Sequence, residues 1–143
     1  MKIRRISPQE AKQQLDAGYT YIDVRSVPEF VEGHPEGAVN VPLLHMTANG
    51  MEANPRFLEV MQSNFSNDAQ LVIGCKAGGR SLRAAEMMQT AGYENLFEQR
   101  AGWDGSRDAF GQILEPGWSR LELPIGSGEP EGRSYASLEK KTA

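Results

Sequence analysis

The only cysteine of the chain, Cys75, begins a short segment rich in glycine and positive charge, Cys-Lys-Ala-Gly-Gly-Arg-Ser. An apolar run typical of a buried strand, residues 71–74, precedes it, and a helix-like stretch, residues 81–91, follows it. This order places a thiol in the loop at the N-terminus of a helix, where free backbone N–H groups and the helix dipole favour an anion. The sequence therefore predicts a thiol that ionises readily and acts as a nucleophile.

The neighbours of Cys75 favour a reactive thiol over an inert one. A lone cysteine after an apolar run is commonly a buried core residue. Gly78 and Gly79, however, lower the steric cost of a tight loop whose amides turn inward. Lys76 and Arg80 add two positive charges within the same loop. Because a core cysteine gains nothing from such neighbours, we interpret Cys75 as the nucleophile.

Alternating helix and strand patterns position this loop. Two Ser-Pro or Ser-Val-Pro segments followed by glutamate, at residues 7–10 and 26–29, are typical of helix N-termini with a capping box. The predicted elements are helix 8–17, strand 19–24, helix 28–32, strand 38–41, loop 44–52, a helix from residue 54, strand 71–74, helix 81–91 capped by Ser81, and strand 95–98. This alternation predicts an α/β fold of three layers, with a parallel sheet of about five strands and helices on both faces. Ligands bind beyond the carboxyl ends of such strands, where Cys75 lies.

Other polar residues are interpreted as supports of the site. Asp23 and Arg25 end the second predicted strand at the same sheet edge as the cysteine, and we expect them to brace loops through buried hydrogen bonds. Glu29 is spaced to pair with Arg25 across one helical turn. His34, between glycine and proline, is expected to brace a turn. His45 is the other histidine, so no metal site is predicted, although His45 could line the pocket.

Length and composition limit the class of protein. The 143 residues are 39% hydrophobic and 24% charged, which fits one globular domain. A net charge of −4 argues against nucleic acid or an anionic membrane as partner, and no apolar run approaches the roughly 18 residues of a membrane span. One cysteine excludes an internal disulfide and fits a reducing, cytoplasmic setting. We expect a domain over residues 1–126 and a flexible polar tail over 127–143.

Three separated motifs resemble the rhodanese family. The segment 75–81 resembles the family's active-site loop, Cys-x-x-Gly-x-Arg/Ser. Asp-Val-Arg at 23–25, with Glu-Phe, Gly-His and Gly-Ala-Val-Asn-Val-Pro between residues 29 and 42, resembles its first signature. Gly102-Trp103 resembles its glycine–tryptophan element, and Trp103 is expected to pack beside the loop. The likeness covers about residues 3–125.

The chain departs from the family pattern at several points. Proline and glutamate follow Gly33-His34 where the family usually has isoleucine and proline, and Ala101 replaces the first glycine of a common Gly-Gly-x-x-x-Trp pattern. The stretch 104–118 is longer than the simplest members need. We expect it to pack on the domain rather than form a flap, because its large apolar side chains would otherwise be exposed; these are Phe110, Ile113, Leu114 and Trp118.

The resemblance implies sulfur transfer with no metal or organic cofactor. In that family a cysteine thiolate attacks a sulfane-sulfur donor such as thiosulfate, becomes a persulfide, and passes the outer sulfur to an acceptor such as cyanide or a thiol. On this chain Cys75 would carry the sulfur. Because it has no second cysteine, an outside molecule must discharge it. The implied substrate-binding residues are Lys76, Ala77, Gly78, Gly79, Arg80 and Ser81, with Lys76 and Arg80 attracting the anionic donor.

Three alternatives stay open. The domain could carry persulfide from one protein to another, or serve as a non-catalytic interaction module. A cysteine-dependent phosphatase or arsenate reductase is less favoured. Such enzymes wrap phosphate in a Cys-x5-Arg loop, whereas Cys75 and Arg80 are separated by four residues only.

Overall fold

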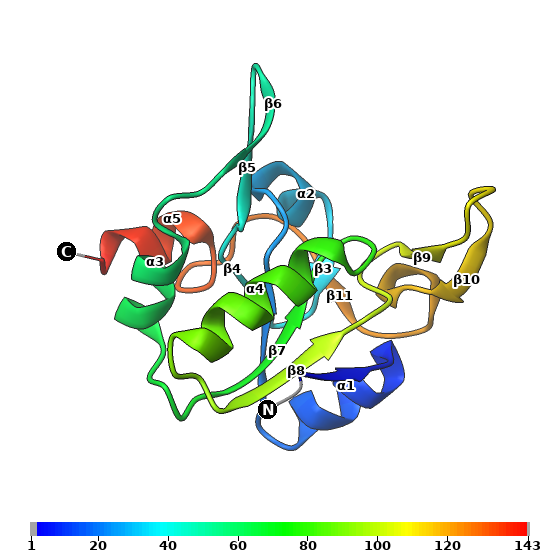
Figure 1. Cartoon of the computed structure of the whole chain (residues 1–143), viewed down its shortest axis with the longest axis horizontal. Coiled ribbons are helices and arrows are strands. Elements are labelled where there is room, and N and C mark those ends of the chain that lie inside the picture. The colour runs from blue at the N-terminus through cyan, green and yellow to red at the C-terminus, as the bar shows by residue number, and fades with distance from the viewer. Residues whose placement is uncertain (1–2, 143) are drawn as a thin grey trace.

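A five-stranded parallel sheet forms the centre of the structure, in the order β1–β8–β7–β2–β4 (Figure 1). The structure is a computed structural model that describes residues 3–142. The strands are β1 (Arg4–Ile6), β2 (Thr20–Asp23), β4 (Val39–Asn40), β7 (Gln70–Gly74) and β8 (Asn95–Gln99). The predicted α/β architecture with about five parallel strands is confirmed.

Helices cover both faces of the sheet. Buried residues of α1 (Pro8–Asp16), α2 (Val27–Glu32) and the 3-10 helix η1 (Trp118–Arg120) belong to the apolar cluster on one face. Residues of α3 (Phe57–Asn64), α4 (Gly79–Thr90) and α5 (Tyr135–Lys140) belong to the cluster on the other. Tyr21 and Val72 point to the first cluster, while Ile22 and Ile73 point to the second, as strand alternation requires. Within residues 3–142, no helix combines the length and apolarity needed to cross a bilayer.

The two predicted capping boxes start α1 and α2. At α1, the Glu10 N–H donates to Ser7 Oγ at 3.1 Å, and Glu10 Oε1 accepts from the Ser7 N–H at 2.9 Å. At α2, Glu29 Oε1 accepts from both the N–H and the hydroxyl of Ser26, at 3.0 and 2.8 Å. These local signals therefore fix where both helices begin.

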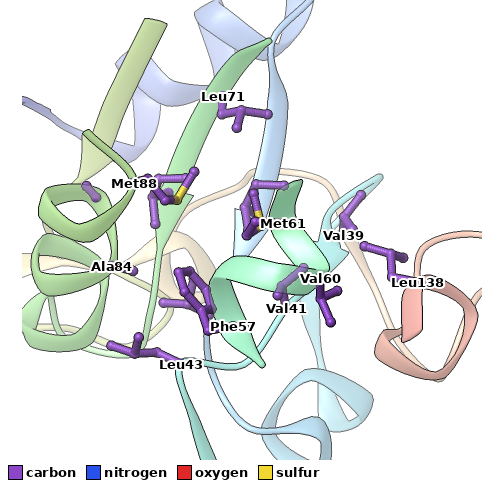
Figure 2. Close-up of a cluster of buried hydrophobic side chains, with 14 of the residues drawn as sticks. Val39, Val41, Leu43, Phe57, Val60, Met61, Leu71, Ala84, Met88 and Leu138 are labelled. Carbon is purple, nitrogen blue, oxygen red and sulfur yellow. The ribbon is translucent and has the colours of Figure 1, made fainter. Parts of the chain in front are cut away.

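The larger apolar cluster fills the space between the sheet, α3, α4 and α5 (Figure 2). Phe57, Val60 and Met61 of α3 point into it together with Ala84 and Met88 of α4. Each large side chain buried in this way contributes roughly 1.5–3 kcal/mol to folding. This packing anchors α4, the helix that carries the cysteine loop at its N-terminus.

Two β-hairpins project from the body of the domain (Figure 1). β5 (Leu44–Thr47) pairs with β6 (Gly50–Ala53), where the sequence predicted an irregular loop. β9 (Gly105–Arg107) pairs with β10 (Ile113–Pro116) within the stretch expected to pack on the domain. That expectation is wrong at the hairpin, because Phe110 is 91% and Leu114 69% exposed, whereas Trp118 is buried.

The C-terminal stretch is structured over its described residues, 127–142, in contrast to the flexible tail that was expected. β11 (Ile125–Gly126) pairs with β3 (His34–Pro35), and the Gly128 N–H donates to the Val31 carbonyl at 2.8 Å. In α5, Tyr135 and Leu138 are buried in the larger apolar cluster. These two side chains, three positions apart on one helical face, are enough to dock the segment.

Candidate active site

Cys75 follows β7 directly and lies in the loop that leads into α4, at the carboxyl end of the sheet as predicted. The residue is 2% exposed. Its Sγ accepts a hydrogen bond from the Gly78 N–H at 3.1 Å, so a loop amide points at the sulfur. Sγ also lies 3.3 Å from the hydroxyl oxygen of Ser81, with the thiol as donor. The N–H groups of the first turn of α4 add partial positive charge at the same place.

Gly78 takes the capping position of α4, so the helix begins at Gly79, two residues earlier than the start that the sequence predicted. The φ of Gly78, +101°, is in the left-handed region, which favours glycine. A Cβ atom there would overlap the carbonyl oxygen of Arg100. Ser81 therefore does not cap the helix; it lies in the first turn, and its buried side chain faces the cysteine.

The glycine–tryptophan element holds the loop from behind. The Trp103 N–H donates to the Cys75 carbonyl at 2.7 Å, and the Asp104 N–H donates to the Lys76 carbonyl at 2.9 Å. Gly102, at φ +70°, lies so close that an added Cβ would be 2.5 Å from the carbonyl carbon and oxygen of Lys76. The prediction that Trp103 packs beside the loop is confirmed.

Arg80 is bound by a carboxylate of the neighbouring helix. Its Nη1 and Nη2 donate to Glu29 Oε1 and Oε2 at 2.8 and 3.0 Å, so the expected pairing of Glu29 with Arg25 is wrong. Burial alone would raise the pKa of Glu29, but hydrogen bonds from Arg80 and Ser26 outweigh it and lower the pKa to about 2. Burial acts against the charge of Arg80, yet Glu29 holds its pKa above the ordinary value. The pair ties the cysteine loop to α2.

Asp23 and Arg25 form a buried ion pair beside this loop, as a bracing role requires. Arg25 Nη2 donates to Asp23 Oδ2 at 2.7 Å and to the Gly33 carbonyl at 2.6 Å. Burial works against the charge of Arg25, but Asp23 leaves its pKa raised. The guanidinium carbon also lies 5.1 Å from the centre of the Trp103 ring. The nearby Asn40 amide donates to the carbonyls of both Asp23 and Arg25 at 3.0 Å, which completes the brace.

A buried carboxylate lies behind the cysteine loop. Glu98 of β8 has no solvent exposure, and its Oε2 accepts from the hydroxyl of Ser81. Its Oε1 accepts from Nε of Arg5, on the adjacent strand β1, at 2.6 Å. Sequence reasoning did not select Glu98. The available signal was a charged residue within a strand expected to be covered on both faces.

The remaining predicted residues differ in their surroundings. Lys76 and Ala77 are exposed at the rim of the loop, and Lys76 enters no ion pair among the described residues. His34 braces a turn, as expected, since its Nδ1 donates to the Phe30 carbonyl at 2.8 Å. His45 lies on β5, with its ring 5.5 Å from that of Tyr135. Over residues 3–142, no three histidine, cysteine or acidic side chains gather as metal ligands.

The rhodanese-like domain family model matches residues 7–109. This range includes the cysteine loop, the Asp23–Arg25 and Glu29–Arg80 ion pairs, and the glycine–tryptophan element. The chain belongs to the rhodanese-like domain family.

Curated relatives and a solved structure agree with this placement. Thiosulfate sulfurtransferase 16, chloroplastic, from Arabidopsis thaliana is 39% identical over 98 residues, which cover 68% of this chain and 82% of that protein. Senescence-associated protein DIN1 from Raphanus sativus is 35% identical over 115 residues. That match covers 80% of this chain and 56% of the relative, so the chain spans little more than half of that protein's length. Rv0390 from M. tuberculosis has the same fold, with a TM-score of 0.74 and 26% identity over 90% of this chain and all of that one.

The rhodanese-like motifs, far apart in the sequence, meet at the cysteine loop. Arg25 of the first motif contacts the ring of Trp103, and a Cβ on Gly33 would lie 2.8 Å from the same ring. Trp103 in turn holds the backbone of Cys75. The motifs therefore form one connected support for the loop, in which each part limits the movement of the next.

Proposed function

We propose that this rhodanese-like domain is a sulfurtransferase that uses a Cys75 persulfide. The Cys75 thiolate attacks the outer sulfur of thiosulfate, the sulfur–sulfur bond of the donor breaks, and sulfite leaves with its electron pair. A thiophilic acceptor, cyanide or a thiol, then attacks the outer sulfur of the persulfide, and Cys75 leaves as the thiolate. Both steps are displacements at sulfur and need no oxidant or metal.

The observation that carries this proposal is the contact between the Gly78 N–H and Cys75 Sγ at 3.1 Å, at the N-terminus of α4. An amide that donates to sulfur stabilises the negative charge of a thiolate. Amides at the start of a helix favour an anion in the same way, and the outer sulfur of a persulfide is such an anion. A six-residue loop, Cys75 to Arg80, leaves room for one added sulfur but less for a phosphate than a Cys-x5-Arg loop does.

The surroundings of the two loop cations support different roles for them. The bidentate pair with Glu29 already compensates the charge of Arg80. Lys76 is exposed next to the cysteine, so we assign to Lys76 the attraction of the anionic donor. Arg80, expected to bind the donor, acts in this proposal mainly by holding the loop against α2.

Mass spectrometry of the intact protein tests the proposal. Treatment with thiosulfate is expected to add one sulfur atom to Cys75, and cyanide is expected to remove it. The Cys75→Ser variant should gain nothing, because it has no thiol. If thiosulfate and other sulfane-sulfur donors all leave the protein unloaded, the proposal is wrong. Turnover of a phosphate ester that depends on Cys75 would favour the phosphatase alternative instead.

A protein-borne thiol is a second candidate acceptor, and the β9–β10 hairpin favours it. This hairpin follows Trp103 directly and presents Phe110 and Leu114 to solvent. Exposed large apolar side chains that lie together on a surface can mark a site of protein interaction. Replacing both by serine should leave sulfur transfer to cyanide unchanged but slow transfer to an acceptor protein. A rate of transfer to the acceptor protein that the substitutions leave unchanged would argue against a role of the hairpin.

A further inference from the structure

Cys75, Ser81 and Glu98 form a continuous hydrogen-bonded row, and Arg5 ends it. Sγ of Cys75 lies 3.3 Å from Ser81 Oγ, whose hydroxyl group reaches Glu98 Oε2. Glu98 Oε1 receives the Arg5 guanidinium at 2.6 Å. The first three side chains are buried, whereas the Arg5 side chain is 44% exposed. The row therefore connects the reactive sulfur to a carboxylate that water does not reach.

The number of available protons determines which group donates and which accepts in each hydrogen bond of this row. A serine hydroxyl has one proton to donate, and an ionised carboxylate can only accept. Because the Ser81 proton is given to Glu98, the Ser81 oxygen presents only lone pairs to Cys75. A thiol can donate its proton to that oxygen, whereas a thiolate would face the lone pairs of Ser81 and keep the Gly78 N–H as its donor. Ionised Glu98 thus favours the thiol form of Cys75, both by this hydrogen-bond order and by its like charge.

We propose that Glu98, acting through Ser81, is a positioning residue that favours the thiol form of Cys75 when it carries no extra sulfur. In the persulfide form, Glu98 allows the outer sulfur to carry the negative charge. The second statement rests on the proposed persulfide chemistry. In the persulfide, the charge is carried one sulfur farther from Glu98. The Glu98 carboxylate therefore destabilises the Cys75 thiolate more than it destabilises the persulfide anion. This difference favours the protein with sulfur bound to Cys75.

Glu98 is the carboxylate that is joined to Cys75 through the Ser81 hydroxyl, and Arg5 pairs with it from β1. Arg80 on α4 is compensated by Glu29 on α2, and Arg25, two residues after β2, is compensated by Asp23. Burial raises the pKa of Tyr21 on β2 far above its ordinary value, so this hydroxyl is neutral at any working pH. The titratable and charged groups on the surrounding elements are Tyr21 and Asp23 of β2, Arg25 just after it, Glu29 of α2, Lys76 of the loop, Arg80 of α4 and Arg5 of β1; of these, Tyr21 and Arg80 interact electrostatically with Cys75, and Arg5 contacts Glu98.

The rate of alkylation of Cys75 by iodoacetamide, measured against pH, tests the proposal without any sulfur donor. Glu98→Gln removes the charge and lets Ser81 donate to sulfur. We therefore expect the midpoint of the pH profile to fall by about one unit, which is a gain of about tenfold in rate below both midpoints. Glu115→Gln is the matched control, since Glu115 also pairs with an arginine, Arg100, and that arginine contacts the row only at the backbone carbonyl of Arg5. Its profile should coincide with that of the unchanged protein.

Two further variants separate this role from a general loss of structure. Arg5→Met removes a half-exposed side chain and leaves the Glu98 charge uncompensated, so the midpoint should rise, opposite to the effect of Glu98→Gln. In a Ser81→Ala background, Glu98→Gln should shift the midpoint by less than it does alone, because the connecting hydroxyl is gone. An unchanged or raised midpoint in Glu98→Gln, a lowered one in Arg5→Met, or an equal shift with and without Ser81 would each overturn the proposal. Because alkylation needs only the thiol, these results stand whether or not the protein transfers sulfur.

Discussion

Replacing Gly102 by alanine should destabilise the domain and displace the cysteine loop. Gly102 has a φ of +70°, a conformation that costs an alanine about 1–2 kcal/mol. The new Cβ would also be 2.5 Å from the Lys76 carbonyl carbon and oxygen and 2.6 Å from the Cys75 carbonyl oxygen. Ordinary contact of such atoms begins at 3.4 Å, so the two segments must separate by almost 1 Å.

Neither segment can move without loss. The Gly102 N–H donates to Gln99 Oε1 at 2.9 Å, and its carbonyl accepts from the Trp118 N–H at 2.9 Å. The Cys75 carbonyl is bound by the Trp103 N–H at 2.7 Å. Overpacking of this kind typically costs about 1–3 kcal/mol, which brings the expected loss for Gly102→Ala to about 2–5 kcal/mol.

Gly37→Ala is the matched control for this experiment. Gly37 has a similar φ, +84°, but an added Cβ would meet nothing within 4 Å. Its substitution should therefore cost only the conformational part, about 1–2 kcal/mol. Urea unfolding of both variants measures the difference, and the rate of Cys75 alkylation reports on the loop. Equal losses of unfolding free energy in the two variants would refute the argument that close approach, rather than backbone conformation alone, requires glycine at position 102.

Three further predictions follow from individual contacts. Lys76→Ala should raise KM for thiosulfate several-fold while the thermal unfolding midpoint stays unchanged, because the side chain is exposed and unpaired among the described residues. An unchanged KM would show that Lys76 does not bind the donor. Glu29→Gln should lower the unfolding free energy by about 1–2 kcal/mol at neutral pH. The lowered pKa of Glu29 stabilises the fold above pH 4.5, and this contribution is lost as pH falls toward 2. Acid unfolding of both proteins should therefore show the difference in unfolding free energy vanish near pH 2. Tyr135→Ala removes a buried ring and a hydroxyl that accepts a hydrogen bond from Asn54 at 3.2 Å. Urea unfolding should show a loss of about 3–5 kcal/mol. A loss below about 1 kcal/mol would indicate that α5 does not dock.

Local signals in the sequence were sufficient for the elements that carry the cysteine. The apolar run of β7 and the glycines after it predict a strand, a loop and a helix without any long-range information. The capping boxes of α1 and α2 depend on residues three apart. Because such contacts form within one turn of chain, the residue types and their spacing are enough to place these elements.

The β5–β6 hairpin and α5 lacked a comparable signal. The strands of the hairpin are exposed or half-buried along their length, so no alternation of apolar and polar residues marks them. In α5, Tyr135 and Leu138 are buried among charged and small residues that resemble a disordered tail in composition. Their packing against the larger apolar cluster, together with hydrogen bonds from Asn54 and Asn64, holds that segment in place.

Partner choice among charged residues could not be predicted for a related reason. Glu29 had a nearby arginine at position 25, yet it pairs with Arg80, 51 positions away, because α2 and α4 come together in the fold. Arg5 and Glu98 are 93 positions apart and become neighbours only through the pairing of β1 with β8. Charges in a sequence show that pairs exist, while the sheet order decides which ones form.

This pairing limits the sources of positive charge at the site. From the sequence, we expected backbone N–H groups at the helix N-terminus to stabilise the anion, and Lys76 and Arg80 to attract the anionic donor. In the structure, Arg80 and Arg25 are each bound to a carboxylate, so their net contribution at Cys75 is small. The uncompensated positive groups at the sulfur are backbone amides, with the Gly78 N–H in direct contact. Backbone amides keep their position only while the loop keeps its shape, and the ion pairs and Trp103 hold that shape. We therefore expect substitutions in the Asp23–Arg25 and Glu29–Arg80 pairs to reduce reactivity by loosening the loop, and the loss should follow the loss of stability rather than the sign of the charge removed. The Arg5–Glu98 pair is the exception, because Glu98 reaches Cys75 through Ser81.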